Sequence, residues 1–344
     1  MNDIRRTILW VIFGFSMVLL WDKWQLHNGN KATFFPSPAA VGAVAPAAGA
    51  SAPLAGAASV PASTAPAVAS IGASAVPGTP APAAPAAREK IEVTTDVYRL
   101  TFDGEGGSLT HAELLKHADM TDKAKNFVLF DESTQRVYAA QAGLIGGSFP
   151  THKPVMTAVP GPRTLKDGEN ELTIRFESPE QGGVKLVKTW TLKRGAYDIA
   201  VKHEVVNVGS TAVSPQLYLQ LVRDGNKPPG ESSFYSTFTG PAVYTDAKKY
   251  QKIEFKDIEN GKVDIPKESP NGYVAMVQHY FASAWLLADG VQRELFTRKV
   301  SDNLYSVGMI TPLGNIDPGT TKVVDARLFA GPQVETMMEK LYPG

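Results

Sequence analysis

The chain has 344 residues, no cysteine, and 34 basic side chains that balance 34 acidic ones. This length is enough for one large domain or two ordinary ones. The missing cysteine excludes disulfides, thiolate metal sites and cysteine nucleophiles. The neutral balance, without a basic run, argues against nucleic acid as a partner, because phosphate binding normally requires a basic excess.

An apolar segment lies close to the amino terminus. Residues 7–21 are fifteen uncharged residues, which is the upper limit for a signal-peptide core and short of the ~20 that a spanning helix needs. No small-residue cleavage pattern follows it, and Arg6 and Lys23 flank it, as they would an anchor. We therefore expect a transmembrane signal anchor over residues 7–26, with residues 1–6 in the cytoplasm. A leader cut at an unusual site is the alternative.

The next segment has a different composition. Residues 32–87 contain no Asp, Glu, Lys or Arg and are dominated by Ala, Pro, Gly, Ser and Val. The repeated prolines exclude a helix, and the few large apolar side chains cannot offset the entropy of folding. We predict a disordered, semi-stiff Ala/Pro-rich linker over residues 27–88.

Period-two alternation dominates the chain from residue 89 onward and predicts strands with one buried face. Five segments are candidate strands: YDIAVKHEVVNV, QKIEFKDI, YVAMVQHYFASAWLL, NLYSVGMI and TKVVDARLF. A sixth segment, SLTHAELLKHAD, fits either a short helix or a strand. The fold class predicted for residues 89–331 is all-β, as a large antiparallel β-sandwich. The alternating apolar sets are Tyr98, Leu100 and Phe102; Leu172, Ile174 and Phe176; Val184, Leu186, Trp190 and Leu192, interrupted by Lys188; and Leu217, Leu219 and Leu221.

The tail, residues 332–344, has a helical pattern instead. Val334, Met337, Met338 and Leu341 follow the spacing i, i+3, i+4 and i+7, which places them on one face. We expect a short amphipathic helix.

Motifs for catalysis or metal binding are missing from the sequence. The six histidines lack zinc-site spacing, and there is no G-x-S-x-G elbow, phosphate-binding loop or complete G-x-G-x-x-G fingerprint. DGEGGS reads instead as a tight turn that needs positive φ. His203 and Glu204 are neighbours in a predicted strand and must point to opposite faces. We therefore assign no catalytic, cofactor-binding or metal-binding residue and expect no cofactor.

One aromatic cluster has two interpretations. Tyr273, His279, Tyr280, Phe281 and Trp285 follow one another closely, and such side chains line sugar or peptide clefts. Core packing is the favoured interpretation for most of them, because a run this apolar usually lies inside a sheet stack.

Several stretches resemble a known family. NGYVAMVQHYFASAW, KTWTLKRGAYDIAVKHEVVN, TDVYRLTFDGEGGSL and ENELTIRF, together with the amino-terminal anchor, are similar to the YidC family of Gram-negative inner-membrane protein insertases. The resemblance runs through almost the whole chain, in the family's order.

The resemblance implies a signal anchor followed by a periplasmic domain with a supersandwich fold, similar in outline to galactose mutarotases. It implies a non-enzymatic role in insertion, folding and assembly of inner-membrane proteins, alone or with the Sec translocon. The implied partners are nascent inner-membrane proteins, the Sec translocon with its accessory subunits, and the lipid bilayer.

The family's bundle of five further membrane helices has no counterpart in this sequence. We expect the chain to be the anchor and periplasmic domain of an insertase, as a fragment or a truncation, and its tail helix to precede a missing second span. Two alternatives are a carbohydrate- or peptide-binding sandwich, with a mutarotase-like protein as one form of it, and an envelope-spanning coupling protein.

Overall fold

The computed structural model describes residues 88–228, 230 and 237–342. The predicted anchor (7–26) and linker (27–88) lie outside these residues, apart from Arg88. In the described part of the chain, neither helix is long and apolar enough to cross a bilayer.

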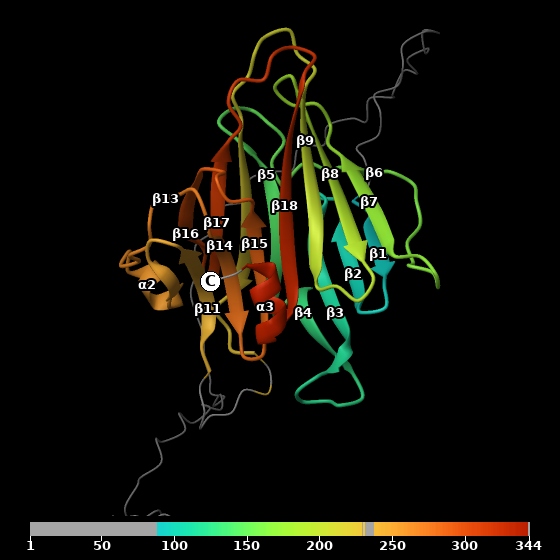
Figure 1. Cartoon of the computed structure of the whole chain (residues 1–344), viewed down its shortest axis with the longest axis vertical. Coiled ribbons are helices and arrows are strands. Elements are labelled where there is room, and N and C mark those ends of the chain that lie inside the picture. The colour runs from blue at the N-terminus through green and yellow to red at the C-terminus, as the bar shows by residue number, and fades with distance from the viewer. Residues whose placement is uncertain (1–87, 229, 231–236, 343–344) are drawn as a thin grey trace, which may run out of the picture. The chain divides into compact units, whose positions relative to one another are not determined.

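Over the residues just given, eighteen strands form two nine-stranded sheets in which neighbouring strands pair antiparallel (Figure 1). The first sheet has, in spatial order, β1 (Lys90–Thr94), β2 (Tyr98–Asp103), β3 (Ser108–Ala118), β4 (Asn126–Glu132), β5 (Val137–Ile145), β10 (Gln216–Asp224), β17 (Leu304–Pro312), β16 (Arg293–Ser301) and β13 (Glu268–Ser269).

The second sheet has, in spatial order, β12 (Lys249–Lys252), β11 (Thr239–Thr245), β14 (Tyr273–Gln278), β15 (Phe281–Leu287), β18 (Thr321–Pro332), β9 (Asp198–Asn207), β8 (Val184–Lys193), β7 (Glu171–Glu177) and β6 (Thr157–Ala158). The described residues also form two short helices, α2 (Phe255–Glu259) and α3 (Glu335–Leu341).

The two sheets enclose a single large apolar core, which confirms the predicted sandwich. All four alternating sets named above are buried on the faces that the sheets share. Lys188, which interrupts one set, is buried with its apolar neighbours on β8. The pattern of alternation thus identified the core face of each of these strands.

Polar side chains inside the core connect one sheet to the other. The Trp285 indole of β15 donates to the Gln220 carbonyl of β10, at 3.1 Å. The Lys188 Nζ of β8 donates to the carbonyls of Gly106 and Ala142 on the first-sheet side, at 2.6 and 2.5 Å. Further connections are Tyr98 with the Tyr197 and Ala330 carbonyls, and Tyr138 with the Met276 carbonyl and the Ser283 hydroxyl.

Two predicted strands are wrong in detail. QKIEFKDI is not one strand, because β12 ends at Lys252 and α2 begins at Phe255. Phe255 and Ile258, three residues apart, both turn inward, with Phe255 stacked on Tyr305 at 4.6 Å between ring centroids. That spacing favours a helical turn over an extended chain.

The segment YVAMVQHYFASAWLL is a hairpin, not a single strand. Gln278 pairs with Phe281, so β14 and β15 are joined by His279 and Tyr280 alone. His279 adopts φ +48°, a conformation that a two-residue turn requires and that glycine or asparagine usually supplies. The usual sequence signal for the turn is therefore missing.

The other open elements are settled by the structure. SLTHAELLKHAD forms β3, the strand alternative. DGEGGS contains the predicted positive-φ turn, at Gly106 and Gly107. The tail forms α3, although only part of its apolar stripe is covered: Leu341 is buried and Met338 is half-buried, whereas Val334 and Met337 are exposed.

Candidate functional site

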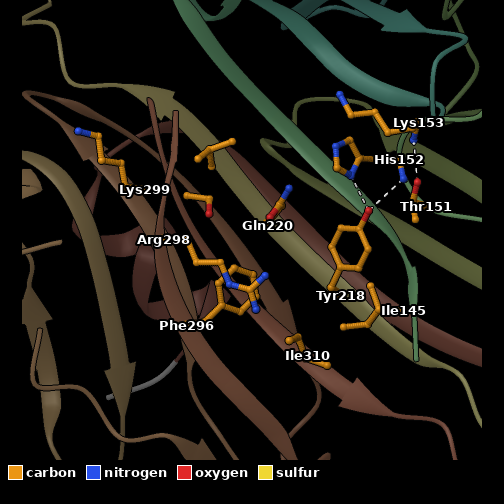
Figure 2. A pocket seen from close by; sticks show the side chains of 12 residues that line it. Ile145, Thr151, His152, Lys153, Tyr218, Gln220, Phe296, Arg298, Lys299 and Ile310 are labelled. Carbon is orange, nitrogen blue, oxygen red and sulfur yellow. Dashed lines mark hydrogen bonds between the residues drawn. The ribbon is translucent and has the colours of Figure 1, made fainter. Parts of the chain in front are cut away.

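A groove of about 380 Å³ lies on the outer face of the first sheet (Figure 2). Its walls come from β5, β10, β16 and β17 and from the loop that follows β5. The lining residues are Ile145, Thr151, His152, Lys153, Tyr218, Gln220, Phe296, Arg298, Lys299, Val300, Ser306 and Ile310. This volume lies within the range of small-ligand pockets.

Two aromatic rings form much of the groove floor. Tyr218 and Phe296 pack with Ile310 and Ile145 in a small apolar cluster that is separate from the sandwich core. Phe296 pairs across strands with Gly308, where an added Cβ would lie 2.4 Å from the ring. The absence of a side chain at Gly308 therefore lets the Phe296 ring lie over the neighbouring strand.

Gly143 has the same relation to Tyr218. The two residues are paired across β5 and β10, and an added Cβ at Gly143 would lie 2.6 Å from the Tyr218 hydroxyl. Two aromatic–glycine pairs on adjacent strands thus place two aromatic rings against this face, where an outward face would ordinarily carry polar side chains.

The Tyr218 hydroxyl is fixed by His152. It accepts the His152 backbone N–H at 2.9 Å and hydrogen-bonds to Nδ1 of the same residue. Burial lowers the pKa of His152 to about 4, with Lys153 and Lys188 contributing, and burial raises the pKa of Tyr218 above its ordinary value. At neutral pH the pair is therefore an uncharged imidazole and a protonated phenol, joined by a hydrogen bond between Nδ1 and the hydroxyl.

Cationic side chains border the groove. The Arg298 guanidinium lies over the Phe296 ring, 4.3 Å from its centroid, as in a cation–π contact. Lys299 makes ion pairs with Glu259 at 3.1 Å and Asp302 at 3.6 Å, and Lys153 with Glu105 at 3.6 Å. Among the described residues, none that lines the groove is acidic.

These features suit binding more than bond-breaking chemistry. A general base needs a pKa near the working pH, whereas the pKa of His152 is lowered to about 4 and its Nδ1 is occupied by Tyr218. A groove with apolar and cationic lining residues instead fits a ligand that combines apolar and charged groups.

The described histidines do not gather into a metal site. No group of three or more His, Asp and Glu side chains with ligand geometry occurs in the described ranges. His111 lies beside Asp131, His117 beside Tyr197, and His279 beside Thr237. His203 is buried on β9 and Glu204 faces outward to Arg175, so this pair lies on opposite faces as predicted.

The predicted aromatic cluster does not form one cleft. Trp285 and Phe281 are buried in the core, where Phe281 stacks on Phe127 at 3.8 Å. Tyr273 packs with Tyr244 and Tyr342 on the other side of the second sheet, beside α3. Tyr280, at the hairpin turn, is 66% exposed. The favoured interpretation, core packing, is confirmed for Trp285 and Phe281.

The groove residues were not predicted from the sequence, although one signal was present. Tyr218 lies between Leu217 and Leu219, and Phe296 follows Leu295, so both strands carry large apolar residues on both faces. A strand that is apolar on both faces is covered on both. In β10 and β16 the second face is covered by the small apolar cluster of Tyr218, Phe296, Ile310 and Ile145.

Comparison with known proteins identifies close relatives. A family model described as the YidC periplasmic domain matches residues 90–344. The membrane protein insertase YidC of Janthinobacterium sp. (strain Marseille) is 46% identical over 342 residues, covering 99% of this chain and 60% of that protein. The same protein of Cupriavidus necator is 49% identical over 342 residues, with the same coverage. The chain thus spans about 60% of the length of these relatives.

Solved structures with lower similarity were also found. A galactose mutarotase-like protein from Lactobacillus casei ATCC 334 covers 70% of this chain and 100% of its own, at 11% identity and a TM-score of 0.41. A galactose mutarotase related enzyme from Lactobacillus acidophilus covers 72% and 99%, at 8% identity and a TM-score of 0.44. The family-model match, by contrast, takes in most of the chain. The chain therefore belongs to the YidC periplasmic domain family.

Proposed function

We propose that this chain provides the membrane anchor and periplasmic domain of a membrane protein insertase. The observation that carries the proposal is the family match over residues 90–344, supported by relatives named membrane protein insertase at 46% and 49% identity. The proposed role is non-enzymatic: to assist insertion, folding and assembly of inner-membrane proteins.

The proposal includes an arrangement in the cell envelope. Residues 1–6 lie in the cytoplasm, 7–26 cross the inner membrane, 27–88 are the linker, and 89–331 form the periplasmic domain, followed by the amphipathic segment 332–344. The balance of basic residues before the apolar segment supports this orientation. The proposed partners are nascent inner-membrane proteins, the Sec translocon with its accessory subunits, and the lipid bilayer.

A chimera tests the insertase role. Residues 1–344 replace the matched 60% of the Cupriavidus necator relative in cells depleted of their own insertase. We expect growth and the insertion of a dependent membrane protein to recover, measured by protease protection of that protein. The intact relative is the positive control, and a stable chimera that restores neither growth nor insertion would contradict the proposal.

Reporter fusions test the orientation. Alkaline phosphatase, which is active only outside the cytoplasm, is fused after Gly344, and a cytoplasm-dependent fluorescent protein is fused there in a parallel strain. We expect an active phosphatase and a dark fluorescent protein. Exchanging Arg5 and Arg6 for Glu should weaken this bias. The reverse pattern of reporter activity in the unmodified chain would overturn the proposed orientation.

A further inference from the structure

The groove on the first sheet meets a second hollow of about 240 Å³ at Ile310. Ile310 lines both, so the two lie side by side on the same outer face. The second hollow is lined by Gln216, Glu268, Gln292, Arg293, Glu294, Ile310 and Pro312. Together the two hollows form one combined groove. Cationic side chains line its first hollow, and the carboxylates of Glu268 and Glu294 line the second.

The acidic end carries charges that the described residues leave unneutralised. Glu268 and Glu294 are direct cross-strand partners on β13 and β16, an arrangement in which like charges repel. Neither makes an ion pair within the described ranges. Arg293 lies beside them but is buried and directs its guanidinium to the backbone carbonyls of Pro270, Gly272, Leu287, Ala288 and Val291.

The basic end has an equivalent group in Arg298. Its guanidinium lies over Phe296, and no carboxylate pairs with it in the part of the chain that the structure describes. Lys299 and Lys153 differ, since each already has at least one acidic partner. Arg298 is thus the border cation with charge available for a ligand.

The spacing of these groups fits an extended polypeptide. Glu294, Phe296 and Arg298 alternate on the outward face of β16. At about 3.3 Å per residue, Glu294 and Arg298 are ~13 Å apart along the strand. An extended chain has the same period, so its side chains at positions i, i+2 and i+4 face Glu294, the Phe296–Ile310 floor and Arg298 together.

We propose that this groove binds an extended peptide segment with a basic residue, an apolar residue and an acidic residue at alternate positions. The basic side chain pairs with Glu294 and Glu268, and the acidic one pairs with Arg298. The apolar one packs against the parts of Phe296 and Ile310 that remain accessible, 8% and 5% of these residues, beside the Arg298 guanidinium that lies over the Phe296 ring. An anionic lipid is a poorer match. Its headgroup could pair with the cations, but the two carboxylates at the other end of the groove would repel its negative charge. This inference goes beyond the proposed insertase role and does not depend on it.

The test uses the full chain in phosphatidylcholine nanodiscs and fluorescein-labelled, end-blocked pentapeptides, with binding measured by fluorescence anisotropy. The matching peptide is Lys-Ser-Val-Ser-Glu. The comparison peptides carry Lys at both ends, Glu at both ends, or Ser in place of Val. We expect the matching peptide to bind about fivefold or more tightly than each comparison peptide, because each lacks one of the three contacts.

Charge-reversal variants make the test specific to this site. Arg298→Glu should prefer the peptide with Lys at both ends, and Glu294→Lys should prefer the peptide with Glu at both ends. Lys185→Glu and Glu171→Lys, exposed reversals on the second sheet, should keep the original preference. All four positions lie on the surface, so we expect the variants to fold. A thermal unfolding curve that matches that of the unmodified chain checks this for each variant.

Three outcomes overturn the proposal. The first is no binding, or binding without discrimination among the four peptides. The second is discrimination that the reversals at Arg298 and Glu294 leave unchanged. The third is lipid specificity: the chain binds phosphatidylglycerol vesicles, the Arg298→Glu variant does not, and no peptide binding is measured when the vesicles are present.

Discussion

At the residue scale, the most unusual side chain is Lys188. It is fully buried between the sheets, and its Nζ is satisfied by two backbone carbonyls and no carboxylate. Burial lowers its pKa from 10.5 to about 7. His203, its cross-strand partner, is also fully buried, and burial lowers its pKa to about 3, with the charge of Lys188 as a further cause.

The first prediction concerns Lys188→Met. The folded-state pKa lies below the unfolded one, so between pH 7 and 10.5 the unfolded chain binds more protons. The free energy of unfolding of the unmodified protein should therefore rise with pH in this window, by on the order of 1 kcal/mol per pH unit from this group. The variant lacks this contribution.

Urea unfolding of both proteins at several pH values measures the effect. Subtracting the Lys188→Met curve removes the titrations that the two proteins share. The difference should be flat below pH 7 and increase toward pH 10 in favour of the unmodified protein. Parallel curves across the window would mean that the Lys188 amine titrates normally in the folded state.

At the element scale, alternation predicted the buried faces of strands such as β7 and β10, because burial on one side of a sheet imposes a period of two. It did not predict the hairpin of β14 and β15, because both strands are buried on both faces and His279 replaces the usual turn residue. The groove was also missed, because Tyr218 and Phe296 each need a glycine as cross-strand partner, and only the strand register shows that Gly143 and Gly308 are those partners.

The second prediction concerns Gly308→Ala on β17. The new Cβ would lie 2.4 Å from the Phe296 ring and 2.6 Å from the Leu219 carbonyl oxygen, and the latter is backbone that cannot rotate away. We expect a loss of roughly 1–3 kcal/mol in the free energy of unfolding. Gly161→Ala is the matched control, because nothing lies within 4 Å of its Cβ position. Equal stability of the two variants would show that the strand pair accommodates the methyl group.

The third prediction concerns the attachment of α3. Tyr342, at its end, packs its ring against Tyr244 and Tyr273. Its hydroxyl accepts the Gly272 N–H at 3.1 Å and donates to Asp289 at 3.2 Å. These contacts hold a helix too short to be stable alone.

Tyr342→Ala should therefore release the helix while leaving the sandwich folded. Hydrogen exchange measured by mass spectrometry should become at least about tenfold faster in residues 335–341, with β9 unaffected. Met337→Ala is the control, because that side chain is 40% exposed. Unchanged exchange in the Tyr342 variant would mean that Met338, Leu341 and the Arg327–Leu341 hydrogen bond suffice to hold α3.

At the scale of the whole domain, the polar connections across the core link the two sheets at separate points. Tyr98 reaches from β2 toward β18, Tyr138 from β5 toward β14 and β15, and Trp285 from β15 to β10. Each places a polar atom within hydrogen-bond distance of one or two partners on the second-sheet or first-sheet side that it faces. Because apolar packing alone is non-directional, these bonds help to fix how one sheet is positioned over the other.

The last prediction follows from that arrangement. Tyr138→Phe keeps the ring but leaves the Ser283 hydroxyl and the Met276 carbonyl without this partner, in a buried site. We expect the free energy of unfolding to fall by about 1–3 kcal/mol, and Tyr250→Phe, at a 43% exposed position, to change it little. Because both sheets share one core, tryptophan fluorescence and far-ultraviolet circular dichroism should still give coincident urea transitions. Separate transitions in the Tyr138 variant would mean that the sheets unfold independently.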